Sequence, residues 1–293
     1  MFRHWFLAIR PKTLIASVLP VTGGTILAYR KTDEISFSVA ILCLLYCLLV
    51  QVGTNLGNDY FDYMKGADKN RKLGPERMVS SGKIKPLHVL NATIFSLSLS
   101  FILGLKILAM VDGGYVLIII GLFSVACAIL YTGGPFPLAY NGFGDIFVIL
   151  FFGLVAVETT HFVLCESANV VWDTNFALSF GIGLLINNLL IVNNYRDYEE
   201  DFRVQKKTTI VLFGRTFGLI FFFFAILITF ILIPVLEPIA WATTFLLPIG
   251  LYFGFKLHKA MTAKDYSFVL AGCAIMVALE TICLVFGFFF ISI

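Results

Sequence analysis

Hydrophobic residues in this chain occur in long, nearly continuous runs, and not in the narrow stripe typical of a water-soluble helix. Nine such runs are found, at residues 14–29, 37–57, 87–109, 115–132, 143–164, 174–194, 216–234, 239–256 and 267–291. A helix needs about 20 apolar residues to cross the hydrocarbon core of a bilayer. The pattern therefore predicts an all-α integral membrane protein with nine transmembrane helices. Because little chain remains between the runs, we expect a single transmembrane domain over residues 1–293.

The composition excludes the main alternatives to a membrane protein. Hydrophobic residues make up 59% of the chain and charged residues 13%, whereas a soluble domain is roughly half apolar and about a quarter charged. The six cysteines form neither a Cys-x-x-Cys pair nor a Cys/His spacing suited to zinc, so we expect buried apolar side chains there.

The basic residues predict the orientation in the membrane. Eighteen of the 21 Lys and Arg precede the first run or fall between runs 2 and 3, 6 and 7, and 8 and 9. Only Arg30, Lys31 and Lys106 fall on the other side. By the positive-inside rule, the N-terminus and the three basic loops are expected in the cytoplasm. An odd number of spans then places the C-terminus on the opposite side.

Two of the predicted span ends carry nearly the same hexapeptide. The second run ends in Asn58-Asp59-Tyr60-Phe61-Asp62-Tyr63, and the sixth ends in Asn193-Asn194-Tyr195-Arg196-Asp197-Tyr198. Four of the six positions are identical, and the copies lie four spans apart. This repeat predicts a bundle of two duplicated four-helix units plus one further helix.

The repeated motif concentrates oxygen ligands on one side of the membrane. Asn58 and Asp62 are four residues apart, so they share one helix face, and the same holds for Asn193 and Asp197. Asp201 extends the second stripe, and Asp68 follows the first. Unpaired carboxylates at membrane depth are costly, and hard oxygen ligands suit Mg²⁺. The basic residues that accompany both stripes complete a candidate site for a diphosphate; a single Lys among them serves equally well as a solvated loop charge.

At these residues the sequence resembles the UbiA superfamily of membrane prenyltransferases, which has nine transmembrane helices and two Asp-rich motifs, on the second and sixth helices. It is most similar to the branch that prenylates 1,4-dihydroxy-2-naphthoate in menaquinone synthesis. That likeness is carried by the stretches Arg10-Pro11-Lys12-Thr13-Leu14, Leu73-Gly74-Pro75 through Ser81-Gly82, Tyr131-Thr132-Gly133-Gly134-Pro135-Phe136-Pro137-Leu138, and Lys206-Lys207-Thr208. Two stretches depart from the family pattern, Glu158-Thr159-Thr160-His161 and Val204-Gln205.

The resemblance implies a reaction and a role for each candidate residue. Mg²⁺ bridges a polyprenyl diphosphate, the allylic C–O bond breaks, and an aromatic acceptor captures the prenyl group in a bacterial cell membrane. The implied metal ligands are Asn58, Asp62, Asp68, Asn193, Asp197 and Asp201, with Asp62, Asp197 and Tyr131 as catalytic residues. The implied diphosphate ligands are Lys12, Lys65, Arg71, Arg77, Lys206 and Lys207. Glu158 and His161 are weaker candidates, because an acceptor contact and a pair between helices explain them equally well.

Several alternatives stay open at this point. Another aromatic acceptor is compatible with the motifs: dihydroxy-6-naphthoate, 4-hydroxybenzoate, homogentisate or haem. A CDP-alcohol phosphotransferase also uses clustered Asp residues, but its continuous Asp pattern is missing from the sequence. A transporter with carboxylates in its path would place them at mid-span and not at the span ends.

Overall fold

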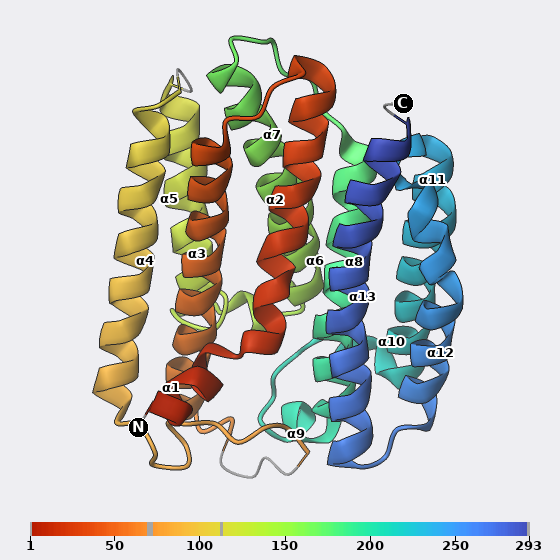
Figure 1. Ribbon diagram of the computed structural model, residues 1–293. Helices are drawn as coiled ribbons and strands as arrows, with labels where there is room; N and C mark the ends of the chain where they lie inside the picture. The colour runs from red at the N-terminus through yellow and green to blue at the C-terminus, as the bar shows by residue number, and fades with distance from the viewer. Residues whose placement is uncertain (1, 69–72, 112–113, 292–293) are drawn as a thin grey trace.

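The computed structural model describes residues 2–68, 73–111 and 114–291, and it is a bundle of long helices running up and down (Figure 1). In the described ranges, eight helical segments are long and apolar enough to cross a membrane: 11–32, 37–64, 86–108, 144–167, 176–196, 209–236, 238–259 and 263–290. The shorter apolar helix α5 (Gly114–Leu130) occupies the remaining predicted span. The prediction of an all-α membrane protein is therefore confirmed, with one of the nine predicted spans shorter than the rest.

Several spans are built from more than one helical piece. The long unbroken helices are α2 (Pro11–Thr32), α3 (Phe37–Met64), α4 (Pro86–Leu108), α8 (Phe176–Arg196) and α13 (Ala263–Ile291). The fifth span joins α6 (Gly144–Val148), the π-helical turn η2 (Ile149–Val155) and α7 (Ala156–Ser167). The seventh joins α10 (Thr209–Leu227), η3 (Ile228–Leu232) and α11 (Ile233–Leu236), and the eighth joins η4 (Pro238–Leu246) and α12 (Leu247–Lys259). Such irregular turns inside a span satisfy their backbone groups locally.

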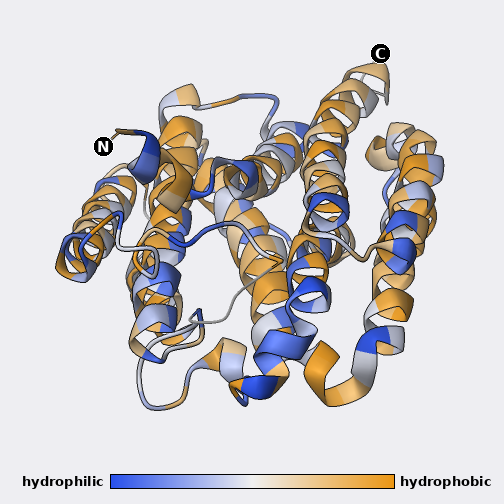
Figure 2. Cartoon of the chain, turned by 90° about the horizontal axis from the view of Figure 1, so that it is seen from below, coloured by the Kyte–Doolittle hydropathy of each residue, from blue (hydrophilic) through white to orange (hydrophobic). Residues whose placement is uncertain are grey.

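Both hexapeptides lie at the same end of the bundle, which we call the motif end and define by Asp62 and Asp197. Two short helices, α1 (Phe2–Ile9) and α9 (Tyr198–Arg203), lie at this end, at the bottom of Figure 1, and the C-terminus lies at the opposite end. Seen from the motif end, hydrophilic residues gather on the connecting segments and helix ends, while the helices themselves are mainly hydrophobic (Figure 2).

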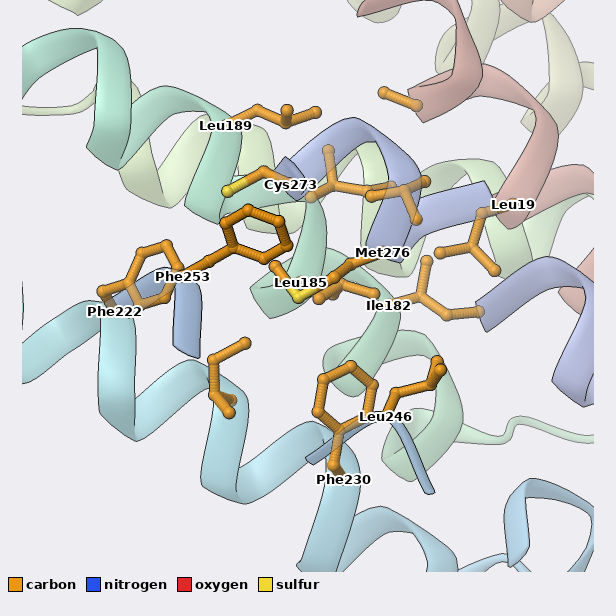
Figure 3. Close-up of a cluster of buried hydrophobic side chains, with 14 of the residues drawn as sticks. Leu19, Ile182, Leu185, Leu189, Phe222, Phe230, Leu246, Phe253, Cys273 and Met276 are labelled. Atoms are coloured by element: carbon orange, nitrogen blue, oxygen red, sulfur yellow. The ribbon is translucent and has the colours of Figure 1, made fainter. Parts of the chain in front are cut away.

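Helix α8 is surrounded by other helices and forms the centre of the main core. Leu185 of α8 is almost fully buried and lies in one cluster with Leu19 of α2, Phe222 of α10 and Met276 of α13 (Figure 3). Of the membrane spans, α8 is the most buried. The second hexapeptide is therefore held by a helix whose faces are nearly all covered by protein.

Glycines and a buried polar group fix α8 against its neighbours. A Cβ on Gly183 would lie 2.7 Å from the carbonyl oxygen of Ile149, so only glycine allows η2 this close. Nearer the motif end, the Asp145 carboxylate accepts hydrogen bonds from Asn187 Nδ2 at 3.0 Å and Thr209 Oγ1 at 2.6 Å. These bonds tie α6, α8 and α10 together.

Candidate active site at the motif end

The first motif occupies the last two turns of α3, where both of its predicted ligands are buried. Asn58 is 9% exposed and Asp62 is 4% exposed. Asn58 Oδ1 accepts a hydrogen bond from Thr132 Oγ1 at 2.7 Å, and Asp62 Oδ1 accepts one from the Tyr140 hydroxyl at 2.7 Å. The segment between α5 and α6 therefore folds over the first motif and contacts both residues.

Arg77 lies between two carboxylates of the first motif. Its Nη2 is 3.5 Å from Asp62 Oδ2, and its Nε is 3.5 Å from Asp68 Oδ1. Asp59, next to Asn58 on α3, accepts a hydrogen bond from the backbone N–H of Met78 at 3.2 Å. Asp59 thereby fixes the segment that carries Arg77 against the helix that carries Asp62.

The second motif differs in shape from the first. Helix α8 ends at Arg196, and Asp197 links it to α9. The Asp197 carboxylate accepts two hydrogen bonds from the Arg196 guanidinium, at 2.6 and 2.7 Å. Asp201 is buried, and its Oδ1 lies 3.4 Å from Lys206 Nζ. The stripe expected along one continuous helix is therefore broken at Asp197, although the turn from Asp197 to Asp201 keeps a helical hydrogen bond of 2.8 Å.

Tyr140, which the sequence analysis did not single out, joins the two motifs. Its ring centroid is 4.4 Å from Lys65 Nζ and 5.3 Å from Lys206 Nζ. Its carbonyl oxygen accepts a hydrogen bond from the backbone N–H of Lys207 at 3.0 Å. Burial, together with the negative charge of Asp62, raises the pKa of the Tyr140 hydroxyl, so this group stays protonated and donates. Its position shortly after the Gly-Gly-Pro stretch was the one sequence signal that pointed to it.

The remaining cations of the predicted diphosphate site occupy different environments. Lys65 is exposed, but its ammonium group donates to the Thr132 carbonyl, and partial desolvation of that group lowers its pKa. Lys12 and Lys207 are likewise exposed. Arg71 lies outside the described residues. The structure thus brings Lys65, Arg77 and Lys206 next to the acidic motifs.

A cavity of about 280 Å³ enters the bundle from the two motifs. Asn58 and Asn193 both line it, so residues from both hexapeptides face the same space. Arg10 and Tyr131 also line it near this mouth, while its deeper walls are mainly apolar side chains of α3, α5 and the fifth span. The cavity combines a polar mouth with an apolar interior, which suits a ligand with a charged head and a hydrocarbon tail.

The arrangement of oxygen donors fits a divalent cation that arrives with its ligand. Within residues 2–68, 73–111 and 114–291, no three His, Cys, Asp or Glu side chains converge as a ready-made metal site. The carboxylates are divided between the motifs, and each lies beside a cation. Mg²⁺ usually takes one or two carboxylates and completes its shell with water and substrate phosphates. The donors present therefore fit Mg²⁺ with a diphosphate better than a cage made of protein ligands alone.

Glu158 and His161 lie away from the motif end. The Glu158 carboxylate accepts hydrogen bonds from the backbone N–H of Asn175 at 3.2 Å and from the Ser179 hydroxyl, and so it fastens α7 to the start of α8. His161 Nδ1 is 3.9 Å from Glu158 Oε2. Neither side chain lines the cavity, although Thr159 and Thr160 between them do. Of the two readings left open by the sequence, the structure favours the contact between helices.

Comparisons with known proteins agree with these observations. The model of the UbiA prenyltransferase family matches residues 17–270. The chain is 35% identical over 208 residues to 1,4-dihydroxy-2-naphthoate octaprenyltransferase of Bacillus subtilis (strain 168), a match that covers 70% of this chain and 64% of that protein. It is 37% identical over 213 residues to the protein of the same name from Mycobacterium tuberculosis, covering 73% of this chain and 70% of that protein. The match with the Bacillus protein thus spans less than two thirds of that protein's length.

A solved structure shares the fold. A UbiA homologue from Archaeoglobus fulgidus, bound to DMAPP and Mg²⁺, superposes with a TM-score of 0.63 at 16% sequence identity. The superposition covers 97% of this chain and 98% of that one. At this level of identity the likeness concerns the arrangement of helices.

Proposed function

The chain belongs to the UbiA prenyltransferase family, and on that basis we propose that it transfers a polyprenyl group from polyprenyl diphosphate to an aromatic acceptor, with Mg²⁺ as its cofactor. One observation carries this proposal: Asn58 and Asn193, one from each motif, line the mouth of a single apolar cavity. A diphosphate bound there would lie between the two acidic motifs, with its hydrocarbon tail inside the bundle.

The residues of the two motifs, with the cations beside them, would bind the donor and assist departure of the diphosphate. Asn58, Asp62, Asp68, Asn193, Asp197 and Asp201 are the proposed metal-binding set. Bound Mg²⁺ would neutralise the charge that builds on the diphosphate as the C–O bond breaks. Lys65, Arg77 and Lys206 lie beside these carboxylates and would add hydrogen bonds to the phosphate oxygens.

The cavity wall would protect the reacting carbon. Tyr131 lines the cavity near its mouth, and we propose that its ring faces the allylic cation. Apolar walls on the other sides would keep water from capturing the cation before the acceptor does. We therefore assign Tyr131 a catalytic role together with Asp62 and Asp197.

We further propose 1,4-dihydroxy-2-naphthoate as the acceptor, with demethylmenaquinone as the product. The bacterial relatives described above carry that activity in their names and support this choice. We also propose that the motif end faces the cytoplasm, because 18 of the 21 Lys and Arg lie on that side of the spans. Reporter fusions to the N-terminus test the orientation, and an extracellular N-terminus would overturn it.

The reaction can be tested with purified protein in liposomes. The protein is supplied with Mg²⁺, a labelled prenyl diphosphate and a panel of acceptors: 1,4-dihydroxy-2-naphthoate, 4-hydroxybenzoate, homogentisate and haem. We expect a prenylated product with the naphthoate. Transfer to a different acceptor would refute the acceptor assignment alone, while no transfer to any of them would refute the function.

Substitutions of single acidic residues test the proposed metal-binding site. Asp62→Asn and Asp201→Asn are expected to lose at least a hundredfold in rate, because each removes a carboxylate of the proposed metal-binding set. Asp173→Asn is the control, since Asp173 is an exposed acid at the opposite end whose carboxylate pairs with Lys31. Equal rates for all three variants would contradict the proposed site.

A further inference from the structure

The depth of the cavity can be measured along α3 from the two motifs. Along α3, it extends from Asn58 at the mouth to Tyr46 and Cys43. Twelve residues separate Asn58 from Tyr46, which corresponds to roughly 18 Å at about 1.5 Å per helical residue. An extended isoprene unit is roughly 5 Å long, since four carbon–carbon bonds of about 1.5 Å join its ends. The cavity therefore holds about four units before a tail reaches Tyr46.

A second, smaller pocket begins on the far side of Tyr46. It has a volume of about 20 Å³ and lies between α4 and α5, which stand side by side at the edge of the bundle (Figure 1). Four residues line both this pocket and the main cavity: Tyr46, Gly104, Leu117 and Gly121. On its outer side the pocket is bordered by Leu105 and Ile118, which are exposed on the bundle surface. Tyr46 thus stands between the cavity and the lipid-facing surface.

Packing against α4 and α5 holds Tyr46 there. Its hydroxyl is buried and makes no hydrogen bond of normal geometry in the described part of the chain. The neighbouring Ser124 hydroxyl donates instead to the Ile120 carbonyl at 2.7 Å. A Cβ on Gly104 would lie 3.3 Å from the Tyr46 ring, and a Cβ on Gly121 would lie 3.9 Å from its hydroxyl. Because these two positions are glycines, the Tyr46 side chain packs directly against the backbones of α4 and α5.

We propose that the gap between α4 and α5 at Tyr46 is the exit through which donor tails longer than about four isoprene units leave the bundle for the lipid. The Tyr46 side chain is the gate of this exit, closed for short tails and displaced by long ones. The inference rests on the proposed function, and it assigns Tyr46, Gly104 and Gly121 to the handling of the tail. In the proposed function the diphosphate binds elsewhere, at the motif end.

The test compares a two-unit donor with an eight-unit donor in liposomes. Ile118→Trp blocks the outer mouth of the exit from an exposed position, so it is expected to fold. Ile119→Trp is the matched control, because Ile119 is exposed on the same helix but lines neither pocket. We expect Ile118→Trp to lower kcat/KM for the eight-unit donor at least tenfold, with less than a twofold change for the two-unit donor and for the control.

A second pair of variants blocks the exit from within. Gly121→Leu fills the passage, whereas Gly121→Ala fits in the space above the Tyr46 hydroxyl. Only the leucine variant is expected to discriminate against the eight-unit donor. Equal losses for both donors, or no loss for either, would place the tail elsewhere, for example beside the stacked rings of Phe123 and Phe151, and would overturn the exit. A wild-type protein that transfers neither donor would overturn the proposed function itself.

Discussion

Replacing Tyr140 with phenylalanine removes one hydroxyl and leaves the ring that lies between the two motifs. The lost group donates to Asp62 at 2.7 Å. A hydrogen bond to a charged group contributes about 1.5–3 kcal/mol, and each 1.4 kcal/mol corresponds to about a tenfold change. If Asp62 needs this donor in the transition state, kcat/KM for Tyr140→Phe falls about 10- to 100-fold.

The contribution of the ring is measured separately with Tyr140→Ala. This variant also loses the contacts with Lys65 at 4.4 Å and Lys206 at 5.3 Å. Each cation–π contact contributes about 0.5–1 kcal/mol, so a further loss of roughly five- to thirtyfold is expected.

Initial rates at saturating Mg²⁺ provide the assay for both Tyr140 variants, and thermal unfolding shows whether each is folded. Tyr115→Phe is the control, because Tyr115 is exposed at the opposite end of the bundle. A Tyr140→Phe protein with kcat/KM within twofold of the wild type would refute the view that this hydroxyl organises the site.

Three further predictions concern stability and the cofactor. Asp145→Ala is expected to destabilise the protein by about 2–6 kcal/mol, because the buried Asn187 and the half-buried Thr209 lose their acceptor at about 1–3 kcal/mol each; a lower thermal midpoint in detergent measures this. Gly183→Ala is expected to cost about 1–3 kcal/mol, since its Cβ would press on the Ile149 carbonyl. Gly121→Ala, whose Cβ would make only an ordinary contact of 3.9 Å with the Tyr46 hydroxyl, should unfold like the wild type. Removing divalent cations with EDTA is expected to abolish transfer, and Mg²⁺ in excess of the chelator should restore it; full activity in EDTA would contradict the role of the metal.

The sequence predicted the helices well because the bilayer imposes a simple rule on them. A membrane helix needs a long apolar run, and each run can be recognised without knowledge of its neighbours. The position of Asn58 and Asn193 at span ends could also be predicted, because polar residues are easily recognised in an apolar chain. The structure puts both on the wall of one cavity, as the repeated hexapeptide suggested.

Contacts between distant segments could not be predicted in the same way. Tyr140 meets Asp62 across 78 positions of the chain, and a tyrosine in a connecting segment gives no periodic signal. The end of α8 at Arg196 depends on how Arg196 and Asp197 pair, which spacing does not reveal. Glu158 is a further example. Whether it contacts the acceptor or a neighbouring helix depends on which residues of α8 lie beside it, and the sequence does not show this.

The burial of α8 has a consequence for how the protein is made. Helix α8 carries the second motif, but α10 and α13, which cover it, come later in the chain. Asn187 can already donate to Asp145 of α6, but the fully buried Asn188 would lie in an incomplete bundle until those helices are synthesised. Polar groups are poorly tolerated there. We therefore expect the core around the second motif to be complete only after α13 has packed against α8, although α13 carries none of the proposed ligands.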